Sequence, residues 1–388
     1  MISKNESKDF ISQFDFEEKN DYNGSIIGLK KQIDSDIIKS GLFEGASKSN
    51  KNSFIYVKQY FIDSENQNEL KNILKEVFLF KTFQNQNYFP PNIKYSLSKD
   101  EKNLFISFKG NYVSLNALIE SNYNYEEQNG LIQWIIYQIV YTLYLLHSSG
   151  ITLLNVNPSN IFINQYGKIL ISDLSSAIFE NEQYYSYSLP YSSPEFLIDN
   201  SKINQKVDMW SLGILIIELY CKQVRILKPK RTKNSEEEQL KEILSLYEIN
   251  EQYSENDLKN ILISGNDKFE WKLNKNILNK IKDINAINLI SQLLNINPNG
   301  RPTARQVIES NYLKEYKGVD NLDIRDFEKL EEYKKYLQST IINHEIFVNE
   351  IKNINRKESE ITSNSNILIF SNNNNNNINE QEKNEILI

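Results

Sequence analysis

The sequence has very few of the residues that build covalent cross-links or metal centres. Among its 388 residues are one cysteine, Cys221, and two histidines, His147 and His344. A single cysteine excludes an internal disulfide framework and a thiolate metal cluster, and so few histidines argue against a zinc site. This cysteine usage fits a reducing intracellular compartment best, either cytoplasmic or nuclear.

The chain also lacks an excess of positive charge and a long apolar run. It has 44 Lys and Arg against 51 Asp and Glu, a formal net charge of −7, which argues against a general nucleic-acid binder. The longest apolar run, around Leu212–Cys221, contains Glu218 and is too short to span a bilayer. The first 20 residues are polar and charged, without the apolar core of a signal peptide. We therefore expect protein partners, and neither nucleic acid nor membrane.

The composition predicts a large folded region with polar ends. With 40% hydrophobic and 12% aromatic residues, the chain has enough apolar surface for a substantial core. Residues 1–23 read as a polar tail, and residues 317–360 read as a charged helical extension in which charged and apolar residues alternate. Residues 361–388 include the run Asn372–Asn377 and are expected to be disordered.

The hydrophobic pattern predicts strands and one helix first, and then mostly helices. Strands are expected at Ser25–Leu29, Phe54–Tyr60 and Leu104–Phe108, with a helix around Leu70–Phe78. Helices are expected at Leu131–His147, ended by Gly150, and at Asp208–Cys221, with short strands at Ile161–Ile163 and Lys168–Ser172. This order indicates two lobes in an α+β arrangement.

Several short motifs occur in the order that protein kinases show. They are Ile55-Tyr56-Val57-Lys58, Glu76, Pro91-Asn92-Ile93, His147–Ile151, Asn155–Asn160, Asp173-Leu174-Ser175, Ser193-Pro194-Glu195, Asp208–Gly213 and Arg301–Ala304. Across about Gly24–Tyr316 the chain resembles the eukaryotic protein kinase superfamily, on its Ser/Thr side, with a weaker similarity to the cyclin-dependent and MAP kinase branch. The resemblance implies a bilobal kinase fold, with a β-rich N-lobe at about residues 24–110 and a helical C-lobe at about residues 111–316.

The resemblance assigns roles to the side chains that the chain keeps. Lys58 would hold the α and β phosphates of ATP, Glu76 would pair with it, and Asn160 and Asp173 would hold Mg²⁺. Gly41 is the one phosphate-loop glycine position that is kept. The alternative is a buried ion-pair network retained because removing one partner strands the other, and we place this structural interpretation slightly ahead.

Two further roles follow from the resemblance and are architectural. Glu195 and Arg301 would form a buried pair that ties the activation segment, the stretch from Asp173 to Glu195, to the C-lobe. Asp208 would hold the backbone of the catalytic loop.

The catalytic loop departs from the family at its ionisable positions. Asn155 stands where the family has the aspartate that accepts the hydroxyl proton, and Asn157 replaces the lysine that faces the γ-phosphate. Leu154 replaces the arginine that would grip a phosphorylated activation segment. Because a neutral amide is a poor base, the loss of general-base help alone costs roughly 10²–10⁴ in rate. We expect no catalytic residue in this loop.

The nucleotide pocket departs from the family as well. Asp36 and Ile38 occupy the first two glycine positions of the phosphate loop, where side chains obstruct the approach of phosphate to backbone amides. The aromatic residues Tyr56, Phe43 and Phe162 surround the expected adenine slot. We expect these rings to fill the slot, the alternative being that they rotate away and leave a normal pocket.

These departures favour an inactive serine/threonine-protein kinase, a pseudokinase that acts as a protein-interaction or regulatory module. Two alternatives remain, namely a divergent kinase with residual phosphotransfer and a nucleotide-binding switch without turnover. No cofactor is expected, although ATP and Mg²⁺ would bind if the pocket were open. The extension at Phe327–Ile351 is expected to dock on its own C-lobe rather than on another protein.

Overall fold

The computed structural model describes the chain in segments. These are residues 26–31, 41–47, 54–62, 65–125, 130–180, 182, 187–199, 203–229, 235–248, 260, 272–320 and 328–357. The two expected tails, residues 1–23 and 361–388, lie outside the described residues.

The N-lobe is an antiparallel sheet with one long helix beside it. The sheet has five strands in the order β1-β2-β3-β5-β4, and the helix is α2. Their bounds are β1 Ile26–Lys31, β2 Gly41–Ser47, β3 Phe54–Phe61, α2 Gln67–Phe83, β4 Lys94–Leu97 and β5 Asn103–Lys109. The side chain of Asn66 caps the first turn of α2 by accepting from the N–H groups of Asn68 and Glu69.

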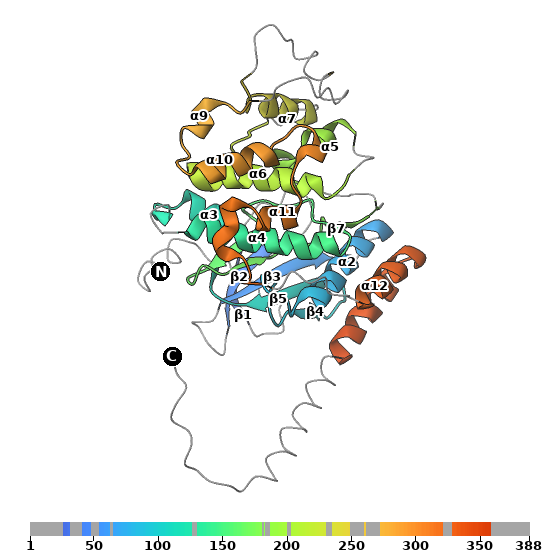
Figure 1. Cartoon of the computed structure of the whole chain (residues 1–388). Coiled ribbons are helices and arrows are strands. Elements are labelled where there is room, and N and C mark those ends of the chain that lie inside the picture. Colours follow the sequence, from blue (N-terminus) through green and yellow to red (C-terminus); the bar gives the residue numbers. More distant parts are fainter. Residues whose placement is uncertain are drawn as a thin grey trace, which may run out of the picture.

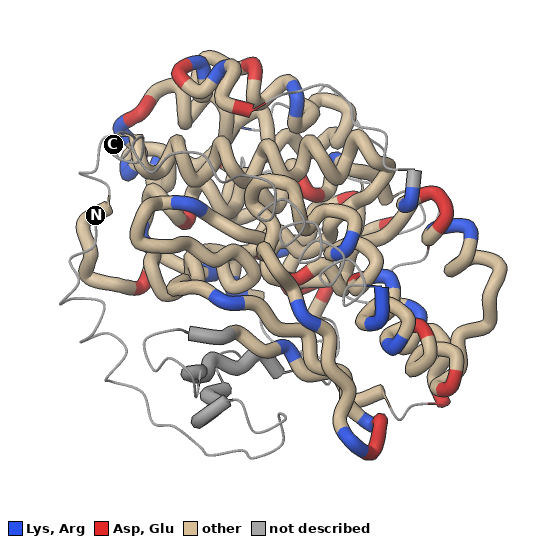
Figure 2. The backbone as a smooth tube through the Cα atoms, turned by 90° about the horizontal axis from the view of Figure 1, so that it is seen from below, with Lys and Arg blue, Asp and Glu red and all other residues tan. Residues whose placement is uncertain are grey.

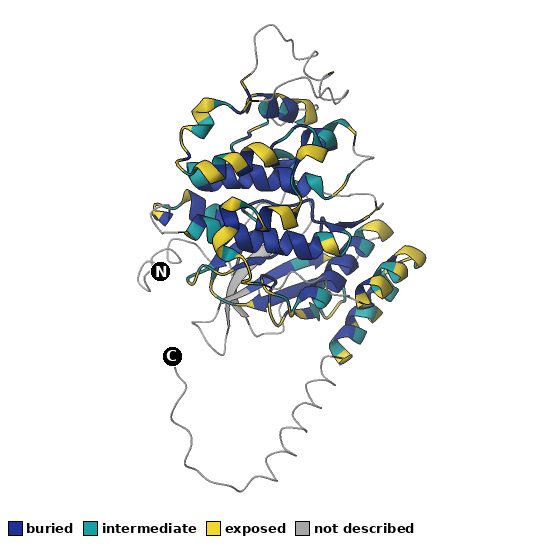
Figure 3. Cartoon of the chain, in the orientation of Figure 1, coloured by how far each residue is buried: buried dark blue, intermediate teal, exposed yellow. Residues whose placement is uncertain are grey.

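The C-lobe is built around two helices, α4 (Leu131–Ser148) and α6 (Lys206–Cys221), which are buried along most of their length (Figures 1 and 3). Helices that are apolar on nearly all faces lie inside a domain, and the shorter helices cover them. The shorter helices are α3 Leu115–Glu120, α5 Pro194–Ile198, α7 Ser235–Leu244, α9 Lys275–Leu278, α10 Ile284–Leu293 and α11 Ala304–Ile308, with 3₁₀ turns η2 Leu189–Tyr191, η4 Pro298–Gly300 and η5 Asn311–Tyr316.

Two small sheets lie between the lobes and position the loops of the site. Strands β6 (Tyr112–Ser114), β8 (Ile161–Asn164) and β9 (Ile169–Ile171) form one of them in the order β6-β8-β9. Strand β10 (Ile178–Phe179) pairs with β7 (Ile151–Thr152) in the other. The loop of residues 153–160 therefore runs between two strands that are held at both ends.

This architecture confirms the α+β, bilobal expectation. The ends of the expected strands and of α4 and α6 are displaced by one or two residues, whereas α2 extends beyond the expected Leu70–Phe78 to Gln67–Phe83. Helix α4 ends where it was expected to end, because Gly150 takes a φ of +71° that suits glycine. No helix among the described residues is both long enough and apolar enough to cross a membrane.

The C-terminal extension differs from its prediction in two respects. It forms two helices, α12 (Glu328–Ser339) and a helix over residues 344–357, because Asn343 caps the second helix by accepting from the N–H of Ile346. It packs mainly on the N-lobe helix α2, as Figure 1 shows, and reaches the C-lobe where Lys334 lies over the ring of Phe179. The extension therefore docks on its own domain, as expected, but its main surface is the N-lobe helix α2 and not the C-lobe. The charge pattern predicts an amphipathic helix without specifying the surface that it covers.

Candidate functional site

A buried group of charged side chains links β3, α2 and the segment after β9. The ammonium of Lys58 lies 2.8 Å from Glu76 Oε1 and 2.7 Å from Asp173 Oδ1. Glu76 also accepts from the backbone N–H of Leu174 at 2.9 Å and from the hydroxyl of Tyr60. Asp173 accepts from the N–H and the hydroxyl of Ser175 at 2.8 and 2.7 Å. The structure thus joins three residues that the sequence placed far apart.

The electrostatics of this group follow from burial and from its opposite charges. Burial would lower the pKa of Lys58, but the neighbouring charges of Asp173 and Glu76 raise it above its ordinary value. Burial alone would raise the pKa of Asp173, yet Lys58 and the hydrogen bonds from Ser175 lower it to about 2. Burial raises the pKa of Glu76 in spite of Lys58. The single ammonium of Lys58 is therefore shared between two carboxylates of the protein itself.

The catalytic-loop amides are bonded to each other. The side-chain N–H of Asn157 donates to Asn155 Oδ1 at 2.6 Å, and Asn157 Oδ1 accepts from the N–H of Ser159 at 2.9 Å. Asn160 donates from its amide to the carbonyl of Asn155 at 3.4 Å. Both Asn155 and Asn157 are buried. The amides satisfy one another, so the loop keeps its shape without an ionised side chain.

Asp208 holds the start of this loop, as the resemblance implied. Its carboxylate accepts from the N–H groups of Leu153 and Leu154, each at 2.8 Å, and lies 2.8 Å from His147 Nε2. Leu154 has a φ of +60°, which is costly for a branched side chain. The two hydrogen bonds from the loop to Asp208 fix this backbone conformation.

Leu154, which stands where the family has an arginine, makes apolar contacts. Its side chain belongs to a small apolar cluster that is separate from the main core. The buried members are Leu154, Ile178, Phe196 and Val207, and Tyr187, Leu197 and Ile203 pack against them. Because Ile178 lies within the activation segment and Phe196 directly follows it, this cluster anchors both ends of the segment by apolar contact.

Aromatic rings fill the space between β3, β5 and β8. The ring of Tyr56 stacks on Phe108, with centroids 5.2 Å apart, and meets Phe162 edge-on at 5.3 Å. Tyr56 has no exposed surface. Its hydroxyl donates to the carbonyl of Tyr112 and accepts from the N–H of the same residue at 3.2 Å. The Tyr56 hydroxyl is thus hydrogen-bonded to both the carbonyl and the N–H of Tyr112, at the start of β6.

The remaining pocket positions are described only in part. Gly41 is the first residue of β2, opposite Gln59 of β3. Phe43 lies in β2 opposite Val57, but its side chain is outside the described residues, as are Asp36 and Ile38. The predicted obstruction of the phosphate loop therefore stays a prediction.

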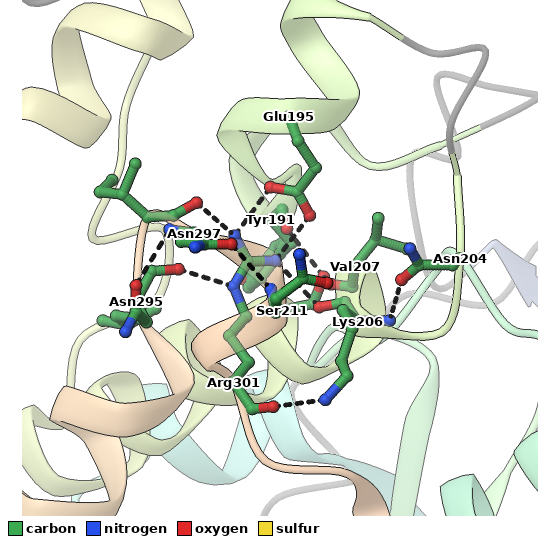
Figure 4. Close-up of polar contacts among 12 residues, drawn as sticks. Tyr191, Glu195, Asn204, Lys206, Val207, Ser211, Asn295, Asn297 and Arg301 are labelled. Atoms are coloured by element: carbon green, nitrogen blue, oxygen red, sulfur yellow. Dashed lines mark hydrogen bonds and ion pairs between the residues drawn. The ribbon is translucent and has the colours of Figure 1, made fainter. Parts of the chain in front are cut away.

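The pair between Glu195 and Arg301 is confirmed and is bidentate. The two guanidinium nitrogens of Arg301 lie 2.6 and 2.7 Å from the Glu195 oxygens (Figure 4). The same guanidinium donates to the carbonyls of Asn295 at 2.7 Å and Lys206 at 3.0 Å. It also lies 5.0 Å from the ring of Trp210. This arrangement ties the end of the activation segment to α6.

Glu218 is a buried carboxyl group below this segment. It accepts from the hydroxyl of Tyr191 at 2.9 Å and from the N–H of Ile226 at 3.0 Å. Burial raises its pKa from 4.5 to about 7. The stability gained from the protonated form is therefore fully present below about pH 4.5 and is lost as pH rises through about 7.

We expect Glu218→Gln to remove this pH dependence, since an amide stays neutral. Relative to the unchanged chain, the variant should gain about 3 kcal/mol in the free energy of unfolding at pH 8, and little at pH 4.5. Urea unfolding at the two pH values measures the difference. Glu309→Gln, at an exposed position, is the control and should leave the pH dependence unchanged. Equal gains at both pH values would contradict this prediction.

The sequence model of the family described as "Protein kinase domain" matches residues 39–313, most of the chain. The chain belongs to the protein kinase superfamily. Among its relatives are "Mitogen-activated protein kinase 3" of Arabidopsis thaliana, 24% identical over 68% of this chain and 71% of that protein, and "Mitogen-activated protein kinase hog1" of Trichoderma harzianum, 30% identical over 48% and 52%. The "Mitogen-activated protein kinase pmk-1" of Caenorhabditis elegans is 25% identical over 54% of this chain and 58% of that protein. The chain spans about half the length of most of these relatives. All three are MAP kinases, which supports the similarity to that branch.

Protein kinase domains use ATP and Mg²⁺. In this chain the end of the site that would hold phosphate and metal differs from the end that would hold adenine. The phosphate and metal end keeps Lys58, Asp173 and Asn160. Lys58 is already paired on two sides, and the backbone groups of Tyr112 are bonded to Tyr56. The adenine end in this conformation does not fit a nucleotide, because a protein ring and hydroxyl occupy it.

Several residues of the site were missed by the sequence reasoning. Tyr60 lies two positions after Lys58 on β3, so the period of a strand places both on one face and could have indicated it. Phe108 lies opposite Tyr56 through the pairing of β3 with β5. No sequence signal fixes that register, and none identifies Tyr112 as the partner of Tyr56.

Proposed function

We propose that this chain is a catalytically inactive, Ser/Thr-kinase-like protein that acts as a protein-interaction or regulatory module. The observation that carries the proposal is the loop of residues 153–160, which contains no ionisable side chain. In that loop the amides of Asn155 and Asn157 bond to each other, so no group there is available to accept the proton of a substrate hydroxyl.

The closed adenine slot supports the same proposal independently. Tyr56 takes the backbone donor and acceptor of Tyr112, and Phe162 and Phe108 pack against its ring. An ATP molecule would have to displace a fully buried tyrosine before its phosphates reached Lys58. We therefore expect no cofactor in the resting protein.

We propose that the partners of this chain are proteins. Figure 2 shows basic and acidic residues interspersed along the described chain, without a face of one sign in that view. Such a distribution of charged residues does not favour nucleic acid, which selects clustered Lys and Arg. We propose an intracellular location, consistent with the presence of a single cysteine, Cys221.

A divergent kinase with residual phosphotransfer is the second candidate. Lys58, Glu76 and Asp173 are arranged as an intact ion-pair group, which supports it. A binding switch without turnover shares this support, and it differs by requiring a nucleotide to enter.

A sensitive phosphotransfer assay separates the residual kinase from the two candidates without turnover. With radiolabelled ATP and either Mg²⁺ or Mn²⁺, the full chain should transfer no phosphate to itself or to a broad substrate above the level of an Asp173→Ala variant. An active MAP kinase in the same assay is the positive control. Transfer that Asp173→Ala abolishes would establish the residual enzyme and overturn the proposal.

A further inference from the structure

Helix α2 is contacted by the C-terminal extension on the side away from the sheet. The ring of Phe78 in α2 stacks on Tyr333 of α12, with centroids 4.1 Å apart and planes at 7°. Tyr336 meets the same ring edge-on at 6.1 Å. Figure 1 shows α12 alongside α2, and Leu330 and Leu337 are buried in this contact region. The extension is thus packed on the helix that carries Glu76.

The activation segment contacts α2 one turn earlier. Lys75, only 1% exposed, forms an ion pair with Glu182 at 3.0 Å. The carboxylate of Glu182 also accepts from the N–H of Phe179 at 3.0 Å. A buried lysine is costly without a partner, so Glu182 compensates a charge on α2 that would otherwise be isolated.

A third contact joins the extension to the activation segment. The ammonium of Lys334 in α12 lies 5.7 Å from the ring centroid of Phe179 in β10. Strand β10 is in turn paired with β7 at the entrance to the catalytic loop. Helix α12 therefore contacts α2 and Phe179, and α2 contacts Glu182.

We propose that α12, Glu182 and α2 form a phosphate-independent clamp that keeps Glu76 on Lys58. The negative charge that reaches α2 comes from a carboxylate of the chain itself, and Leu154 anchors the segment by carbon contacts where an arginine would grip a phosphate. The proposal of a clamp does not depend on whether the chain is catalytically active. The clamp also couples the C-terminal helices to the buried site.

Hydrogen–deuterium exchange of the full chain tests the clamp. The chain is produced without phosphate, as checked by intact mass, and α2 should then be protected. Tyr333→Ala with Tyr336→Ala should raise exchange about tenfold in residues 67–83 as well as in 328–357, since two ring contacts are lost. Glu182→Gln, on the other side, should raise exchange in α2 by about threefold.

Lys335→Ala is the matched control, because this lysine lies on α12 between the two tyrosines and is exposed. It should leave α2 unchanged. Faster exchange confined to residues 328–357 after the tyrosine changes would overturn the proposal, as would an unprotected α2 in the phosphate-free chain. If the tyrosine variant does not fold, Glu182→Gln decides alone: unchanged protection of α2 then overturns the clamp.

Discussion

Arg301→Ala should destabilise the folded chain by about 3–5 kcal/mol, because it leaves the carboxylate of Glu195 without its charge partner. Arg301 is 1% exposed, and its guanidinium bonds Glu195 and three backbone carbonyls. Those carbonyls lose their donor together with the carboxylate, so the loss exceeds that of a simple ion pair. For a domain of this size the melting temperature should fall by roughly 10 °C, measured by calorimetry or by circular dichroism.

Arg305→Ala provides the matched control on the neighbouring helix. Arg305 forms an ion pair with Glu309 at 3.1 Å, but the two side chains are 58% and 48% exposed. Exposed pairs contribute about 0–1 kcal/mol, so this variant should melt within about 3 °C of the unchanged chain. Similar melting temperatures for the two variants would contradict the anchoring role of Arg301.

The ion pairs that join kinase motifs could be predicted from the sequence alone. Glu195 and Arg301 were predicted as a pair because each lies in a motif whose order along the chain is specific to kinases. Lys58 and Glu76 were predicted for the same reason, and the structure joins them at 2.8 Å. Motif order encodes which residues meet, even when more than 100 residues separate them.

Contacts outside the motifs could not be predicted, because they depend on register and on docking. The bond between Tyr56 and Tyr112 requires the pairing of β3 with β5 and the path of the chain after β5. The site of α12 on Phe78 depends on the connection after Tyr316, which has no periodic pattern. An amphipathic helix indicates that one face is covered, but the covering surface is a tertiary property.

Tyr56→Ala should turn a closed slot into one that binds adenine compounds. Removing the ring leaves a cavity between Phe108 and Phe162, and it frees the N–H and the carbonyl of Tyr112. The variant should lose about 3 kcal/mol in the free energy of unfolding, as large-to-small core changes do. A cavity with an apolar wall and one free donor and acceptor suits a planar nitrogen heterocycle.

Melting curves with adenosine and with ATP and Mg²⁺ test this gain. The unchanged chain should show no shift at millimolar ligand, whereas Tyr56→Ala should gain about 1–2 kcal/mol, a rise of a few degrees, if the ligand is present at about ten times its Kd. Tyr125→Ala is the control, since Tyr125 is equally buried and donates to the carbonyl of Leu219 at 2.9 Å, far along the chain from the slot. It should lose stability and gain no shift.

Adenosine tests the adenine end of the site alone, whereas ATP with Mg²⁺ also tests the phosphate and metal end. Adenosine carries no phosphate, so a shift with adenosine alone would show that Tyr56 was the obstruction at the adenine end while Lys58 stays committed to Glu76 and Asp173. A larger shift with ATP and Mg²⁺ would show that Lys58 and Asp173 still accept phosphate and metal once the ring is gone. A shift of equal size in the unchanged chain would contradict occlusion, because it would mean that the ring of Tyr56 leaves the slot whenever a nucleotide is present.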